Sequence, residues 1–324
     1  MKLLTFRWAG GPPCPGAYLA GGHVVDLRAL GRELRTELRN VTDLLAQEGT
    51  LFRRLSGRLD ALATDPGPGV AAGWIYPYDS VALLPPTGTR PFLLSCGGLY
   101  HSHLQEMGVT SAPPRRPDAY VVNPNTLIGS REPIVLPPAA PAQVDWEGEL
   151  CVVLGRPTHR VGVAAAMDHV AGFTIFNDVS ARDHVPDWVL AADPEGAVRG
   201  YVGNALYKNW PTFGPIGPWI VTRDELPDVG SARLTTMVNG ALMQDDLVGN
   251  LRMSIAEVIA AATEVHAFDT GDMLTFGTPA GVGYARNPRV FLVPGDVVEV
   301  SVAGIGTLTN TVQAAAQSTA HAAA

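Results

Sequence analysis

Short apolar segments separated by glycine and proline dominate the hydrophobic pattern of this chain. Within each segment, apolar residues alternate with polar ones or run together, which is typical of β-strands buried on one or both faces. The pattern predicts strands over residues 1–8, 16–20, 23–27, 92–98, 133–137, 145–155, 173–178, 217–222, 272–279, 296–302 and 306–312.

Helical spacing of apolar residues is confined to three segments. Residues 41–62 carry leucines at mixed helical spacing, interrupted by Gly49 and Gly57, and predict one or two short helices. Residues 163–172 predict a short helix that ends at the glycine in the last position. A capping box of Ser254 and Glu257 predicts that a third helix begins at this serine.

Two segments lack a clear period. Residues 100–132 are polar and contain prolines, which predicts a mobile loop or lid. Residues 314–324 lack bulky apolar side chains and predict a disordered tail. The remaining elements predict an α+β fold that is mostly β, with a small N-terminal α/β domain over 1–85 and a larger roll or barrel over 86–313.

Charge and cysteine content narrow the class of protein. The 31 acidic residues outnumber the 23 basic ones, giving a net charge of −8, so no nucleic-acid partner is expected. No apolar run approaches the length of a membrane span, and the first residues lack the apolar core of a signal peptide. The three cysteines form no C-x-x-C pair, which favours a reducing, cytoplasmic location.

The segment "VDWEGELCVV" contains an unusual pair of carboxylates. Strand alternation places Glu147 and Glu149 on one face with Cys151 and Val153, while the opposite face is also apolar. Two buried carboxylates side by side favour a hard divalent cation, namely Mg²⁺, Mn²⁺ or Ca²⁺. Asp178, at the end of the apolar "FTIFND" strand, is the candidate third ligand. The alternative is a solvated sheet edge, where alternating glutamates are common.

Other candidate chemistry is weaker. His101 and His103 lack the further ligands that a zinc site needs. His103 and Glu106 lie one helical turn apart, so they form either a base with its orienting carboxylate or a surface contact. The chain has no G-x-S-x-G motif, and "GTPAGVG" lacks the Lys-Ser/Thr that follows a phosphate-binding loop.

Together these residues resemble the fumarylacetoacetate hydrolase family, in the family's order and over most of the chain from about Phe92 to Val312. The N-terminal unit resembles the small leading domain of the family's bacterial members. The motifs that carry the resemblance are "LYHSHLQEMG", "DWEGELCVVLG", "FTIFNDVSARD", "KNWPTFGPIGPWIVTRDELPD", "MLTFGTPAGVG" and "VPGDVVEVSVAGIGTLTNTV".

The resemblance implies a mixed β-sandwich roll, a homodimer and a Mg²⁺ or Mn²⁺ site. It assigns the metal ligands to the three carboxylates above and implies a catalytic His–Glu dyad on a lid. The residues assigned by motif match are Glu147, Glu149 and Asp178 for the metal, His103, Glu106, Lys208 and Arg182 for catalysis, and Tyr100, Lys208 and Thr278 for the substrate.

The implied function is a metal-dependent hydrolase that cleaves a C–C bond in an acylpyruvate or β-diketone type of 2-oxo acid. A decarboxylase, isomerase or lyase on the same metal-enolate scaffold, and a non-catalytic ligand-binding member, stay open as alternatives. The chain departs from the family pattern at Leu99 and Ser102 in the lid motif, at Asn123 in place of a lysine, and at Val185 in place of a glutamine.

Overall fold

The computed structural model describes residues 1–46, 50–183 and 193–316. Its strands are β1 Lys2–Arg7, β2 Cys14–Leu19, β3 His23–Asp26, β4 Ile75–Pro77, β5 Ala82–Leu84, β6 Leu93–Gly97, β7 Asp118–Val122, β8 Leu127–Ile128, β9 Ile134–Leu136, β10 Val144–Asp145, β11 Gly148–Leu154, β12 Val170–Asn177, β13 Ser180–Ala181, β14 Gly214–Thr222, β15 Arg233–Val238, β16 Ala241–Leu247, β17 Met273–Thr275, β18 Val297–Val302 and β19 Gly306–Ala314. Its α-helices are α1 Leu27–Leu34, α2 Val41–Leu45, α3 Thr50–Thr64, α4 Gly67–Ala71, α5 His101–Glu106, α6 Val163–Ala166, α7 Pro194–Leu206 and α8 Ile255–Val265.

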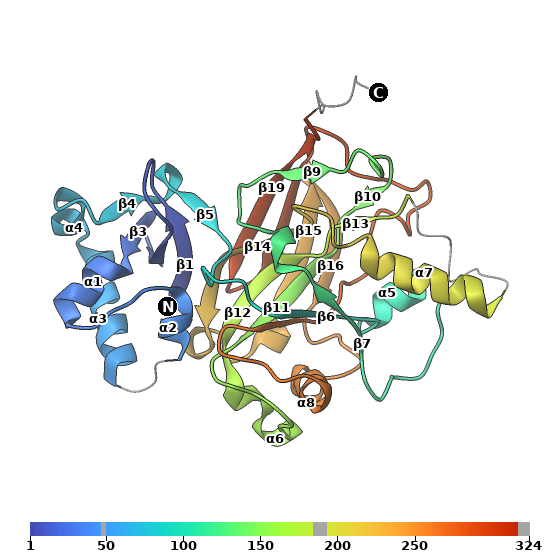
Figure 1. The fold of residues 1–324 in the computed structure, drawn as a ribbon, viewed down its shortest axis with the longest axis horizontal. Helices are drawn as coiled ribbons and strands as arrows, with labels where there is room; N and C mark the ends of the chain where they lie inside the picture. The colour runs from blue at the N-terminus through green and yellow to red at the C-terminus, as the bar shows by residue number, and fades with distance from the viewer. Residues whose placement is uncertain (47–49, 184–192, 317–324) are drawn as a thin grey trace, which may run out of the picture.

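A large mixed sheet forms the frame of the molecule (Figure 1). Its strands follow the order β4-β3-β2-β1-β14-β12-β11-β17-β6-β7, with β5 paired to β1 and β8 to β14. The central strand β11 lies between β12 and β17, antiparallel to both. Every residue of β11 is buried, and so is Glu147, which directly precedes it, so the alternative that Glu147 and Glu149 line a solvated sheet edge is wrong.

A second sheet, in the order β16-β15-β18-β19-β9, packs against one face of the large sheet. The two sheets approach closely at Gly148, where a Cβ atom would lie 2.3 Å from the Thr236 hydroxyl. The glycine is therefore required for sheet packing directly beside Glu147 and Glu149. Buried side chains between the sheets, including Leu150 and Val152, form the larger core.

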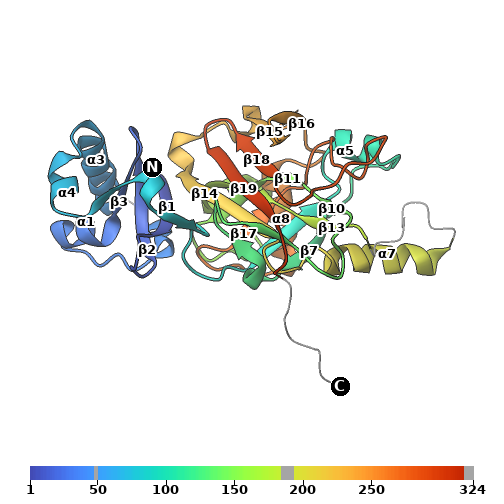
Figure 2. The same cartoon turned by 90° about the horizontal axis from the view of Figure 1, so that it is seen from above.

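The N-terminal unit extends the large sheet. Strand β1 pairs with β14 through Lys2 opposite Val221, and α1 and α3 cover the sheet face that carries the smaller core. Helix α7 lies at the end of the molecule opposite this unit (Figures 1 and 2). The predicted boundary at residue 85, between the N-terminal domain and the larger domain, stays a prediction.

The fold class is confirmed: the described residues form an α+β structure that is mostly β, and their sheets do not close into a barrel. The predicted strands form, although the segment 145–155 is interrupted at Trp146 and Glu147, between β10 and β11. The capping box at Ser254 starts α8 as expected. Among the described residues, none of the helices has the length and apolar character to cross a membrane.

Three local predictions were wrong. The helix expected over 163–172 ends at His169, because the chain enters β12 at Val170 and Gly172 packs closely against the Val221 backbone. Helix α3 runs through Gly57, which is surrounded by open space. The segment 100–132 is not one continuous loop, since it contains α5, β7 and β8, whereas its movement as a lid stays a prediction. Of the predicted tail, Ala314 ends β19 and residues 317–324 lie outside the described residues.

Candidate metal-dependent active site

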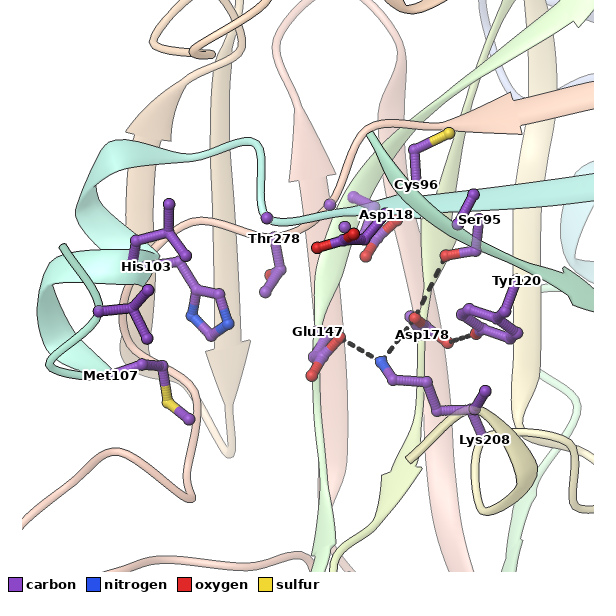
Figure 3. A pocket seen from close by; sticks show the side chains of 18 of the residues that line it. Ser95, Cys96, His103, Met107, Asp118, Tyr120, Glu147, Asp178, Lys208 and Thr278 are labelled. Atoms are coloured by element: carbon purple, nitrogen blue, oxygen red, sulfur yellow. Dashed lines mark hydrogen bonds and ion pairs between the residues drawn. The ribbon is translucent and has the colours of Figure 1, made fainter. Parts of the chain in front are cut away.

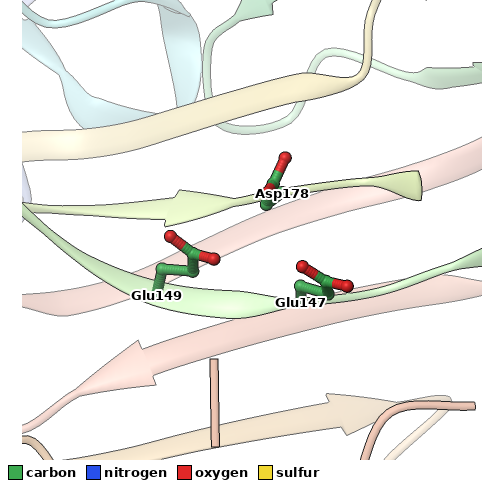
Figure 4. Close-up of side chains that lie close together, drawn as sticks. All are labelled: Glu147, Glu149 and Asp178. Carbon is green, nitrogen blue, oxygen red and sulfur yellow. The ribbon is translucent and has the colours of Figure 1, made fainter. Parts of the chain in front are cut away.

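Three buried carboxylates meet where β11 begins and β12 ends. Glu149 lies on β11, Glu147 directly precedes this strand, and Asp178 directly follows β12. The backbone N–H of Asp178 donates to the carbonyl of Glu147 over 2.8 Å, which fixes the two chain segments together. One oxygen from each carboxylate lies within 4.8 Å of the others, so the three side chains converge on one point (Figure 4).

Two cations are held against this cluster. The Lys208 Nζ atom donates to Glu147 Oε2 over 2.5 Å and to Asp178 Oδ2 over 2.6 Å. The Arg182 guanidinium pairs with Glu147 and, at 3.3 Å, with the fully buried Asp145. Both predicted catalytic cations therefore contact carboxylates of the cluster, and their predicted contacts with substrate stay predictions.

The cluster has more negative than positive charge. Among the described residues, the carboxylates Asp145, Glu147 and Asp178 pair with Arg182 and Lys208, and Glu149 adds a fourth carboxylate, so two negative charges remain unbalanced when all six groups are ionised. Buried unbalanced charge is costly unless a counterion is bound. A divalent cation supplies the two missing positive charges.

The pKa shifts follow this imbalance. Burial opposes ionisation of Glu147, but Lys208 and Arg182 outweigh it and lower the pKa of its carboxyl to about 2. Burial, together with Asp178 and Glu147, raises the pKa of Glu149 well above its ordinary value. Burial also raises the pKa of Asp178, against the effect of Lys208. Glu149 is thus the carboxylate with the least compensation.

An unsatisfied oxygen marks where a ligand belongs. Glu149 Oε2 is buried and has no hydrogen-bond partner among the described residues. Buried polar atoms in native proteins are nearly always satisfied by protein, water or an ion. With three carboxylate ligands, the donor set is all oxygen, which suits Mg²⁺, Mn²⁺ or Ca²⁺. The residues present therefore fit a divalent cation.

The cluster opens into a cavity of about 310 Å³ (Figure 3). Its walls come from the end of β6, from α5 with the segment that follows it, from β7 and from the turn at Thr278. The side chains of Glu147, Asp178, Lys208 and His103 all face this space in Figure 3. A small molecule bound here contacts the acidic cluster and α5 together.

Helix α5 carries the predicted dyad. His103 Nδ1 lies 2.7 Å from Glu106 Oε1, and both side chains are largely buried. Glu106 Oε2 also accepts a 2.8 Å hydrogen bond from the Gly281 backbone, so its carboxylate is fixed on two sides. The hydrogen bond to Glu106 orients the imidazole ring through Nδ1. The other ring nitrogen, Nε2, is then the one that can act in the cavity that His103 lines.

The two remaining predicted substrate residues differ in position. Thr278 lines the cavity, but its hydroxyl donates to the Gly148 carbonyl at 2.9 Å and accepts from Gln244 at 2.6 Å. Tyr100 is 1 % exposed and is not among the residues that form the cavity wall. The structure thus brings Thr278 to the site but leaves Tyr100 beneath its surface.

Two important residues were missed by the sequence interpretation. Asp145 continues the period-two pattern of Glu147 and Glu149, and this alternation was a usable signal. Tyr120 donates its hydroxyl hydrogen to Asp178 from β7. No sequence signal indicated Tyr120, because its contact depends on β7 reaching the sheet beside β6.

The departures from the family pattern are accommodated locally. Ser102 Oγ donates to Asp246 Oδ2 over 2.8 Å, which holds α5 against β16. Leu99 is buried in the larger core. The Asn123 side chain caps the short turn after β7 by accepting from the Asn125 N–H. Val185 lies outside the described residues.

Comparison with known proteins matches most of this chain to a single family. The family model described as "Fumarylacetoacetate (FAA) hydrolase C-terminal" matches residues 94–313. The oxaloacetate tautomerase FAHD2A, mitochondrial, of Homo sapiens is 32% identical, and the match covers 96% of this chain and 91% of that protein.

Solved structures share the fold. A fumarylacetoacetate hydrolase from Exiguobacterium antarcticum superposes with a TM-score of 0.75 at 26% identity, covering 97% of this chain and 100% of that one. A 5-carboxymethyl-2-hydroxymuconate delta-isomerase from Mycobacterium smegmatis superposes with a TM-score of 0.69 at 27% identity, covering 98% and 100%. On the motifs, the fold and these matches, the chain belongs to the fumarylacetoacetate hydrolase family.

Proposed function

We propose that this protein is a divalent-metal-dependent enzyme that forms the enolate of a 2-oxo acid, and that its reaction is the keto–enol tautomerisation of oxaloacetate or a close analogue. The observation that carries the proposal is the convergence of Glu147, Glu149 and Asp178 in one cavity, which is also lined by His103 of the His103–Glu106 dyad. The name of the human relative, which matches nearly the whole chain, supports the choice of reaction.

Different residues of the site would bind the metal, remove the proton and stabilise the negative charge. Glu147, Glu149 and Asp178 would hold Mg²⁺ or Mn²⁺, which acts as a Lewis acid toward a chelating carboxylate and 2-oxo group. His103, oriented by Glu106, removes a proton from carbon 3, and Lys208 stabilises negative charge on the 2-oxygen. The proton that His103 has taken is then returned to that oxygen and gives the enol, so the reaction consumes and releases nothing else.

Hydrolysis of an acylpyruvate is the second candidate, because the same dyad is equally suited to activate water. In that reaction His103 takes a proton from water as its oxygen adds to the 4-carbonyl carbon. The bond between carbons 3 and 4 then breaks, its electron pair enters the pyruvate enolate, and a carboxylic acid is released. Loss of CO₂ would instead indicate the decarboxylase alternative.

The test is to follow enol oxaloacetate by its ultraviolet absorbance with Mg²⁺, with Mn²⁺ and with EDTA. We expect metal-dependent acceleration of the enol decay, with no more CO₂, pyruvate or other cleavage product detected by mass spectrometry than in an enzyme-free sample with the same metal. A panel of 2,4-dioxo acids assayed in parallel tests hydrolysis. Metal-dependent acid release, with no effect on oxaloacetate, would replace tautomerisation by hydrolysis, and inactivity in both assays would favour the non-catalytic alternative. The homodimer and the cytoplasmic location stay predictions.

A further inference from the structure

Three basic side chains with fixed positive charge line the active-site cavity: Arg182, Lys208 and Arg252. The first two are paired with carboxylates of the acidic cluster. Arg252, in the segment between β16 and α8, was not indicated by any sequence motif. Its surroundings differ from those of the other two cations.

Arg252 is half-buried and is held by neutral oxygen atoms. Its guanidinium donates to the carbonyl of Gly98 over 3.2 Å, and to the carbonyl and hydroxyl of Ser111 over 2.8 and 3.3 Å. Its backbone N–H donates to Leu99 over 2.7 Å. Within the described parts of the chain no carboxylate forms an ion pair with Arg252, and this includes Asp118, which lines the same cavity.

The position of Arg252 separates it from the acidic cluster. Ser95 on β6 contacts Asp178, while Gly98, three residues further along the chain, contacts Arg252. Because β6 ends at Gly97 and Gly98 has a positive φ, the strand rise of about 3.3 Å per residue separates the two positions by roughly 10 Å at most along one cavity wall. A molecule anchored at the cluster by its 2-oxo acid end therefore extends toward Arg252.

The cavity that Arg252 lines has both apolar and polar walls. Leu104, Met107 and Val109, on α5 and the segment after it, line it together with the polar Ser111 and Asp118. A half-buried arginine that lines a cavity and forms no ion pair with the described carboxylates is a suitable site for a carboxylate of the ligand, because guanidinium–carboxylate hydrogen bonds are charge-assisted.

We propose that Arg252 binds a second carboxylate of the substrate, so that the enzyme selects 2-oxo dicarboxylates over 2-oxo monocarboxylates. This inference rests on the proposed function for the orientation of the substrate. Arg252 is a specificity residue and takes no part in the proton transfer. The competing explanation is that Arg252 only ties Ser111 to Gly98 and so shapes the cavity wall for every substrate.

The experiment compares oxaloacetate with 2-oxobutanoate, which has the same carbon chain and one carboxylate. Wild type, Arg252→Gln and Arg252→Lys are assayed with Mg²⁺ for proton exchange at carbon 3, and binding of each acid to the Mg²⁺-loaded protein is measured by calorimetry. Arg116→Gln is the matched control, since it removes an exposed arginine that pairs with Glu264 outside the cavity.

We expect Arg252→Gln to weaken oxaloacetate binding and its kcat/KM by about 10- to 100-fold, the usual effect of losing a charged hydrogen-bond pair. The values for 2-oxobutanoate should change less than about threefold, Arg252→Lys should recover part of the loss, and Arg116→Gln should match wild type. Equal losses for both acids would show that Arg252 only holds Ser111 to Gly98, and would overturn the proposal. A wild-type enzyme without preference for the dicarboxylate would also overturn it. If wild type binds oxaloacetate through Arg252 without turning it over, the proposed function fails while this assignment holds.

Discussion

Replacing Glu149 with glutamine is expected to stabilise the metal-free protein and to remove most of its metal affinity. Glutamine has nearly the same shape but no charge, so it relieves the repulsion that Glu149 experiences from Asp178 and Glu147. The same change deletes one of three anionic ligands. A residue that only supports the fold would not produce these two opposite effects.

The magnitudes follow from burial. Glu149 is 2 % exposed and one of its oxygens is unpaired, whereas a glutamine amide there can donate to the adjacent carboxylates, a difference worth about 1–3 kcal/mol. With about 2.1 cal/mol/K of unfolding entropy per residue, a chain of 324 residues gains roughly 1.5–4 °C in Tm. Metal affinity should fall at least about 100-fold, since loss of an indirect partner of a metal ligand already costs 10- to 100-fold.

The stabilisation has a defined pH dependence. Because burial and the neighbouring carboxylates raise the pKa of Glu149 in the folded state, the folded metal-free protein holds this proton more tightly than the unfolded chain. Wild type therefore loses stability as pH rises above the ordinary carboxyl range, about 4.3, and the variant does not lose this contribution. The Tm difference should be small at pH 4 and largest at pH 8.

The assay is differential scanning calorimetry in EDTA across this pH range, with Mn²⁺ titration calorimetry at neutral pH. Glu264→Gln is the control, because it removes one exposed carboxylate that pairs with Arg116. A Glu149→Gln protein that binds Mn²⁺ within threefold of wild type would refute the ligand assignment. A metal-free variant less stable than wild type would refute the charge argument.

Three further predictions concern the cavity walls. His103→Ala should lose about 10²-fold in kcat while retaining metal and oxalate binding, whereas His101→Ala should be nearly silent; the reverse pattern in the tautomerase assay would show that the dyad is misassigned. Tyr120→Phe removes a hydrogen bond to Asp178 and should weaken Mn²⁺ binding about tenfold by calorimetry, and unchanged binding would make the tyrosine a packing residue. Cleavage within 100–132 in limited proteolysis should slow when Mg²⁺ and oxalate are added, and equal cleavage would indicate a fixed segment.

The shared face of Glu147 and Glu149 could be predicted from the sequence because side chains alternate between the two faces of a strand. Once 145–155 is interpreted as a strand buried on both faces, Glu147 and Glu149 must point the same way, and the structure places them so. The same rule applied to Asp145 but was not extended to it. The wrong end of the helix at Gly172 has a tertiary cause, since this glycine is needed where β12 approaches β14.

Contacts between distant segments were beyond sequence reasoning. Tyr120 reaches Asp178 across 58 residues of sequence, and Arg252 reaches Gly98 across 154. Neither residue belongs to a local pattern, because their roles depend on which strands become neighbours in the large sheet. The substrate end of the cavity is therefore the part that only the structure makes visible.

The most direct test of the central claim, that a divalent cation held by this cluster drives enolate formation, is deuterium exchange at carbon 3 of a 2-oxo acid in D₂O. Proton NMR follows the loss of the carbon 3 signal with wild type in Mg²⁺, with wild type in EDTA, and with Glu149→Gln in Mg²⁺. We expect rapid exchange in the first sample and near-background exchange in the other two. Exchange that persists in EDTA, or in the Glu149→Gln variant, would contradict the central claim.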